Sequence, residues 1–208
     1  RMFSFNSPFG ACPTCMGLGM QLKADPALII PDENLSILDG AVVACGWNSI
    51  RSDGISRMYF EALAKRHHFD LRTPVKELSP EVKKVIFYGT GEEKLELHYD
   101  QPRGKGVLHQ AFEGLATNVE RRYRETQSDA SRKELEEYMA ECPCPDCGGR
   151  RLKKSALAVT VGGLSIAEFT DLSVIKALEF INGLELTGND ALIAERIIKE
   201  IRARLGFL

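Results

Sequence analysis

Short stretches of alternating hydrophobic and polar residues predict several brief strands in this chain. Residues 3–6 alternate phenylalanine with serine and asparagine, and residues 20–23 and 94–99 repeat the same period of two. Because successive side chains of a strand point to opposite faces, this period predicts half-buried strands. Residues 157–161 predict one more strand, which ends at the glycine pair 162–163.

Helical periodicity alternates with these strands. Apolar residues recur at helical spacing over 57–68 and over 112–123, which predicts two amphipathic helices. The helix after Ser79 is expected to stop at Gly89, and the helix after Ser131 is expected to run through Met139. Three more helices are predicted from capping residues, namely Ser165, Ser173 and Asn189. The chain is therefore predicted to be an α+β protein.

Composition narrows the class of protein. The chain has 208 residues, of which 44% are hydrophobic and 27% are charged, as in ordinary soluble globular domains. The formal net charge of −2 excludes bulk attraction to nucleic acid, so any basic surface must be local. No apolar run reaches the roughly 20 residues that span a membrane, and no signal peptide is visible at the start. The length predicts one or two domains, and the abrupt ends predict a segment of a longer protein.

The strongest signal is a pair of Cys-Pro-x-Cys knuckles, at 12–15 and 144–147, each followed by glycine. In such a knuckle two thiolates lie on one tight turn and can point at a single metal, while glycines let backbone N–H groups approach the sulfurs. Two knuckles complete a tetrahedral four-thiolate site. The predicted Zn²⁺ ligands are Cys12, Cys15, Cys144 and Cys147.

The other cysteines are placed outside this site. Cys142 lies beside the second knuckle as an extra thiol, and Cys45 follows an apolar run that predicts a small core residue. Cysteines paired in this way favour a reducing compartment and a metal over a disulfide framework.

Clustered cations are candidates for contacts with nucleic-acid phosphates, although a solvated charge run explains such clusters equally well. They lie after the second knuckle, near the end of the helix predicted from residue 112, and in the glycine-rich turn 101–106. The candidates are Arg103, Lys105, Arg121, Arg122, Arg124, Arg150, Arg151 and Lys153. The sequence contains no P-loop and suggests no nucleophile with a partnering base, so no catalysis is predicted within this chain.

Several motifs together resemble one protein family over essentially the whole chain. They are residues 3–19 and 144–152, which hold the knuckles, and residues 112–114, 120–126 and 200–208. All of them closely resemble the UvrA family, the damage-recognition ATPase subunit of the bacterial excinuclease in nucleotide excision repair.

The resemblance implies a segment of the first half of UvrA, where an insertion domain interrupts a signature domain. It also implies a cytoplasmic, zinc-binding, dimeric parent protein that scans double-stranded DNA for damage, hydrolyses ATP and loads UvrB. The Walker motifs and the ATPase signature are absent from these residues, so ATP use is expected only in the full-length parent. In the family's second half a similar pair of knuckles shares one zinc, which supports joining Cys12 and Cys15 with Cys144 and Cys147. The family also carries a Cys-x-x-Cys upstream of residue 3, and a pairing with that motif stays open.

The expected architecture is a signature subdomain of helices and strands, pinned by zinc knuckles and interrupted by a small α+β insertion domain. Its boundaries are 1–30 for the first part of the signature subdomain, 31–139 for the insertion domain and 140–208 for the second part. The insertion domain is a candidate DNA clamp. Two alternatives are a DnaJ-like zinc chaperone module, because residues 12–19 fit its repeat, and a thiol oxidoreductase that uses a Cys-x-x-Cys motif.

Overall fold

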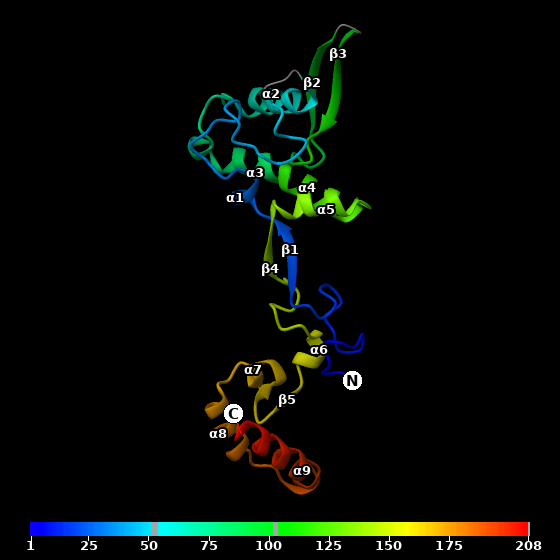
Figure 1. Ribbon diagram of the computed structural model, residues 1–208, viewed down its shortest axis with the longest axis vertical. Coiled ribbons are helices and arrows are strands. Elements are labelled where there is room, and N and C mark those ends of the chain that lie inside the picture. The colour runs from blue at the N-terminus through cyan, green and yellow to red at the C-terminus, as the bar shows by residue number, and fades with distance from the viewer. Residues whose placement is uncertain (51–53, 102–103, 208) are drawn as a thin grey trace. The chain divides into compact units, whose positions relative to one another are not determined.

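The chain forms two compact units, and one of them is built from both ends of the sequence. The computed structural model describes residues 1–50, 54–101 and 104–207. The first unit comprises Arg1–Gln21 and Pro143–Leu208, and the second comprises Leu22–Cys142. The chain enters the second unit along β1 (Met20–Ala24) and leaves it along β4 (Met139–Pro143), and these two strands pair (Figure 1).

The second unit combines helices with one antiparallel hairpin around a single hydrophobic core. Its elements are α1 (Pro26–Ile29), α2 (Ile55–His67), the 3-10 helix η1 (Val75–Glu77), α3 (Pro80–Tyr88), β2 (Lys94–Gln101), β3 (Gly104–Ala111), α4 (Leu115–Glu125) and α5 (Asp129–Glu136). Helix α2 packs against β2, and α4 packs against both α3 and α5. Phe60 and Phe112 are among the largest side chains of this core and are fully buried.

Local signals explain why several of these elements form where they do. The Ser79 hydroxyl accepts the N–H of Val82 at 3.3 Å, and α3 ends at Gly89, as the sequence predicts. In β2 the predicted alternation is confirmed, because Leu95 and Leu97 are buried while Glu96 between them is exposed. The amphipathic stretch from residue 57 corresponds to α2.

The strand predicted at residues 3–6 is wrong. These residues form turns, in which Ser4 N–H donates to the Arg1 carbonyl and Ser7 N–H donates to the Ser4 carbonyl, both at 3.2 Å. Local turns therefore satisfy the backbone groups that a partner strand would otherwise bond. Phe5 lies instead under the guanidinium of Arg151, whose carbon is 3.5 Å from the ring centroid.

Two predicted element boundaries are also wrong near the return from the second unit. Helix α5 is capped by Ser128, whose hydroxyl accepts Ser131 N–H, and it ends at Glu136 because Met139 already begins β4. Residues predicted as a strand from 157 belong partly to α6 (Lys154–Leu157), and only β5 (Thr160–Val161) remains extended.

The C-terminal part of the first unit is helical. Strand β5 pairs with β6 (Leu164–Ser165), and α7 (Ile166–Thr170), α8 (Val174–Asn182) and α9 (Gly188–Leu205) follow. The capping box of Ser165 and the cap of Ser173 are confirmed. Helix α9 begins after Thr187 rather than at the predicted cap Asn189, and it has no buried residue. Among the described residues, no helix is both long enough and apolar enough to cross a membrane.

We predict that two glycines at the junction of α3 and α4 cannot be replaced. Gly89 and Gly114 have φ values of 86° and 90°, and a Cβ on Gly114 would lie 2.3 Å from the Gly89 nitrogen. Gly114→Ala should therefore lower the free energy of unfolding by about 3 kcal/mol, because a backbone clash adds to left-handed strain.

The matched control is Gly91→Ala. Gly91 also has a positive φ, 63°, but nothing lies within 4 Å of its Cβ position. The substitution Gly91→Ala should lower the free energy of unfolding by about 1 kcal/mol, from backbone strain alone. Urea unfolding followed by circular dichroism measures the free energy of unfolding of both variants. Equal losses would contradict the close approach of Gly114 to the Gly89 backbone.

Candidate metal centre

Four cysteines from the two knuckles lie together in the first unit. They are Cys12, Cys15, Cys144 and Cys147, all of them are buried, and their sulfurs lie within 4.8 Å of one another. The sulfurs of Cys12 and Cys144 are 4.0 Å apart, and those of Cys15 and Cys147 are 3.8 Å apart. A disulfide would need about 2.05 Å. Four sulfurs at about 2.3 Å from a tetrahedral zinc ion are about 3.8 Å apart, so the donor set and its spacing fit a metal ion.

Backbone hydrogen bonds join the two knuckles reciprocally. The N–H of Cys12 donates to the Arg151 carbonyl at 2.9 Å, and the N–H of Cys144 donates to the Gly19 carbonyl at 2.8 Å. Arg151 and Gly19 hold the same place relative to their own knuckles. The two knuckles are thus related by an approximate twofold exchange, in which each binds the tail of the other.

The backbone conformations repeat the same relation. Gly17 and Gly149 have φ values of 84° and 86°, and the residues just before them, Met16 and Gly148, have 51° and 59°. Gly19 at 81° corresponds to Arg151 at 68°. Met16 and Arg151 therefore hold left-handed conformations in which glycine is ordinarily favoured, at a cost of roughly 1–2 kcal/mol each. The knuckle fold requires these turns whichever residue occupies them.

Further contacts reinforce the joint between the knuckles. Thr14 Oγ1 donates to an oxygen of Asp146, so the third residues of the two motifs touch each other. Arg151 Nε donates to the Gly17 carbonyl at 2.8 Å. A β-bridge pairs Ala11 with Leu152. Contacts of this kind hold the sulfurs in place from outside.

The electrostatics of the thiols differ between the two knuckles. Burial works to raise the pKa of Cys15, but backbone N–H groups of Gly19 and Gly17 bond its sulfur and bring that pKa down to about 7. The Gly19 N–H lies 3.2 Å from this sulfur. Burial raises the pKa of Cys147 to about 11. A cation among the four sulfurs would favour the thiolate form of all of them.

The remaining cysteines lie apart from this cluster. Cys45 packs half-buried against the core of the second unit, and Cys142 is half-buried in β4. Neither belongs to the group of four.

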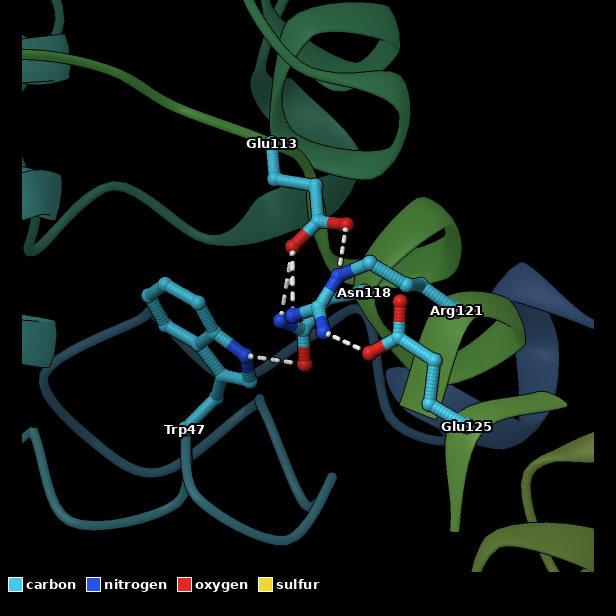
Figure 2. A network of polar contacts seen from close by, with 5 residues as sticks. All are labelled: Trp47, Glu113, Asn118, Arg121 and Glu125. Atoms are coloured by element: carbon cyan, nitrogen blue, oxygen red, sulfur yellow. Dashed lines mark hydrogen bonds and ion pairs between the residues drawn. The ribbon is translucent and has the colours of Figure 1, made fainter. Parts of the chain in front are cut away.

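The cations that the sequence singles out have different environments, and Arg121 is held by carboxylates (Figure 2). Its Nε and Nη2 donate to Glu113 at 2.7 and 3.1 Å, and its Nη1 donates to Glu125 at 2.6 Å. Hydrogen bonds with Glu113 and Glu125 raise the pKa of Arg121, and the Arg121 contact in turn lowers the pKa of Glu113.

The same network reaches a tryptophan. Asn118 Nδ2 donates to Glu113 at 2.9 Å, and Trp47 Nε1 donates to Asn118 Oδ1 at 3.2 Å (Figure 2). The Trp47 ring meets Phe112 edge to face, with centroids 5.4 Å apart. This polar network therefore fastens α4 to the loop that carries Trp47.

Three other candidate cations donate hydrogen bonds to backbone carbonyls. Arg122 Nη1 donates to the Cys45 carbonyl at 2.7 Å, Lys153 Nζ donates to the Pro8 carbonyl at 2.8 Å, and Arg151 is held between Phe5 and Gly17.

The other candidates lie on the surface or in the hairpin. Arg124 and Arg150 are exposed. Lys105 is an exposed residue of β3, and Arg103 lies outside the described residues.

Sequence reasoning missed most of these partners. The pairing of Arg121 with Glu125 has the spacing of one helical turn and was visible in the sequence. The contacts with Glu113, Cys45 and Pro8 depend on tertiary structure and carried no local signal.

Comparisons with known proteins agree with the resemblance noted in the sequence. A family model described as the UvrA DNA-binding domain matches residues 25–137. The UvrABC system protein A of Clostridium perfringens is 44% identical over 208 residues, and that of Bacillus subtilis is 44% identical over 211 residues. Each match covers 100% of this chain and 22% of the relative, so the chain spans about a fifth of the relatives' length.

A solved structure supports the fold. The crystal structure of UvrA2 from Deinococcus radiodurans matches with a TM-score of 0.59 and 24% identity, covering 98% of this chain and 27% of that one. The family model matches more than half of the chain. On these grounds the chain belongs to the UvrA family.

Proposed function

We propose that this chain is a zinc-stabilised, DNA-binding segment of a UvrA protein, and that it carries no catalysis of its own. The observation that carries the proposal is the set of four buried sulfurs, at distances that suit a tetrahedral ion, within a chain that a UvrA DNA-binding model matches. Thiolates in a four-sulfur site select zinc among the common divalent ions. Cys12, Cys15, Cys144 and Cys147 would be its ligands.

The zinc ion would have a structural role and no catalytic one. A site with four protein ligands has no open position for water, so it stabilises the fold and activates no nucleophile. Here it would tie the segment before β1 to the segment after β4. The second unit, Leu22–Cys142, would then act as an insertion carried on a closed joint. The chaperone and thiol oxidoreductase alternatives gain no support, since the relatives found are UvrABC system proteins.

The DNA contacts in this proposal go to backbone phosphates without reading sequence. Arg124, Arg150 and Lys105 are the strongest candidates, because all three are exposed. Arg121, Arg122, Arg151 and Lys153 hold carboxylates or carbonyls, so their main role would be to shape the units that present the exposed cations. Phosphate contacts need positive charge that is free to displace counterions.

The rest of a UvrA protein would supply the other activities. ATP hydrolysis, dimer formation, contact with UvrB and a cytoplasmic role in excision repair of damaged double-stranded DNA are proposed for that longer protein. The segment itself would add a DNA-binding module to it.

The first prediction concerns metal content. Metal analysis of the purified chain should find one zinc per chain, and Cys15→Ser or Cys147→Ser should abolish it, because three thiolates do not close the tetrahedron. The first unit of each variant should also lose stability, since zinc binding and folding are coupled, while the second unit keeps its own core. Cys45→Ser is the matched control and should retain its zinc. Retention of a full equivalent by both knuckle variants would rule out this ligand set.

The second prediction is a pH dependence of zinc affinity. Because burial raises the pKa of Cys147 to about 11, this thiol is protonated in the metal-free chain near neutral pH, and zinc must displace its proton. Proton competition weakens as pH rises, so the apparent affinity should increase by at least about tenfold per unit between pH 6.5 and 8.5. Competition with a chelator of known pH dependence measures this slope. An affinity independent of pH would show that thiols are not the ligands.

The third prediction separates exposed from engaged cations. Arg124→Ala and Arg150→Ala should each weaken binding of duplex DNA and reduce the salt slope of log K by about 0.9, with little change in stability. Arg121→Ala should instead lower the free energy of unfolding, because it strips partners from Glu113.

The control for charge loss is Lys84→Ala, which removes one exposed cation from α3. Fluorescence anisotropy at several salt concentrations measures the DNA binding of all four variants. Urea unfolding measures the stability of Arg121→Ala. Unchanged salt slopes in Arg124→Ala and Arg150→Ala, or the same decrease in Lys84→Ala, would remove these arginines as phosphate contacts.

A further inference from the structure

We propose that Arg151 is a positioning residue of the metal centre, and that its side chain acts as a latch that slows the loss of a bound metal ion. The latch consists of Arg151 and its two side-chain partners, the Phe5 ring and the Gly17 carbonyl. The inference rests on the proposed zinc site. It gives a role at the metal to a residue that the sequence offers as a phosphate contact.

The backbone of Arg151 supports two of the four cysteines. Its N–H bonds the Cys147 sulfur, and its carbonyl accepts the N–H of Cys12 at 2.9 Å. Gly19 holds the equivalent place in the first knuckle, where its N–H lies 3.2 Å from the Cys15 sulfur. Either residue type can supply these backbone groups, so they do not explain why an arginine stands at position 151.

Arginine carries a conformational cost at this position. The φ of Arg151 is 68°, in the left-handed region where Gly19 stands at 81° in the other knuckle. Glycine adopts this region without the steric penalty that a Cβ brings. The backbone bonds would form with glycine as well, so the compensation for this strain has to come from the side chain.

The side chain contacts the opposite knuckle and the first residues of the chain. Nε donates to the Gly17 carbonyl at 2.8 Å, and the guanidinium carbon lies 3.5 Å from the centroid of the Phe5 ring. Cγ crosses Gly19 so closely that a Cβ there would lie 2.8 Å from it. The Phe5 carbonyl in turn packs on Gly17 where a Cβ would be. Arg151, Phe5 and Gly17 therefore contact one another, although they come from distant segments of the sequence.

These contacts are connected to a third cysteine. Gly17 donates its N–H to the Cys15 sulfur while Arg151 holds its carbonyl. A charged donor that fixes this carbonyl limits rotation of the turn, which keeps the N–H aimed at the sulfur. Through its backbone and side chain together, Arg151 thus supports Cys12, Cys15 and Cys147. A metal ion leaves only when its sulfurs separate, so a residue that holds three of the four should slow that loss.

The rate at which the zinc-loaded chain gives up its metal to excess chelator tests the latch. Arg151→Gly is the sharpest variant, because glycine removes the side chain and also relieves the left-handed strain. We expect it to release zinc at least about tenfold faster than the parent chain, as is typical when an outer partner of a metal ligand is lost. Phe5→Leu removes the aromatic face and should speed release by about threefold. The double variant should be no faster than Arg151→Gly, because the contact is already lost.

A second readout follows the ligands themselves. Co²⁺ bound in place of zinc gives a sulfur-to-metal charge-transfer band, which a change of global stability alone would not move. In Arg151→Gly this band should shift to longer wavelength, because the Cys15 sulfur loses part of its hydrogen bonding. An unshifted band would contradict the connection from Arg151 through Gly17 to this sulfur.

The matched control is Lys154→Ala, which removes an exposed cation from the same segment. It should leave the zinc release rate and the cobalt band unchanged. Release from Arg151→Gly at the parent rate would overturn this inference alone, as would equal acceleration in Lys154→Ala. So would a salt slope of DNA binding that falls by about 0.9 in Arg151→Gly with zinc release unchanged, since Arg151 would then contact phosphate. A parent chain without zinc would overturn the proposed zinc site together with the latch.

Discussion

The meeting of four cysteine sulfurs joins the N-terminal segment of this chain to the segment that follows residue 143. Cys12 and Cys15 come from its beginning and Cys144 and Cys147 from its last third, yet all four sulfurs lie within 4.8 Å of one another and are buried. Reciprocal backbone bonds from Cys12 to Arg151 and from Cys144 to Gly19 hold this meeting point from both sides. The segment between the knuckles, which includes Leu22–Cys142, is thereby closed into a loop at its base and folds around a core of its own. Closing so long a loop costs chain entropy, which a bound metal would offset.

The parts of this arrangement that could be predicted from sequence are those in which residue type and spacing act locally. Two Cys-Pro-x-Cys motifs with glycines fix the turn and the ligands together, and caps such as Ser79 and Ser165 fix helix starts. Residues 3–6 misled because alternation indicates a strand only where a partner strand exists, and here Phe5 serves as a platform for Arg151. Helix α5 stops early because the chain must turn into β4, a tertiary demand that leaves no trace in its periodicity.

Candidate cations show the same division between local and tertiary information. The sequence shows only that Arg121, Arg122 and Arg124 lie close together along the chain. The structure adds that Arg121 is held by Glu113 and that Arg122 is held by the Cys45 carbonyl. Arg124, in contrast, is exposed. Net charge is equally uninformative, because a cation paired with carboxylates contributes little to the field felt by DNA.

We propose that all four sulfurs, and nothing else, surround one zinc ion. X-ray absorption at the zinc edge tests this most directly, because it measures the ligand types and distances around the metal in solution. A zinc ion shared by both knuckles should give a single shell of four sulfurs at about 2.3 Å with no nitrogen or oxygen ligand. A shell of two sulfurs completed by nitrogen or oxygen would contradict it, because the two knuckles would then not share a metal.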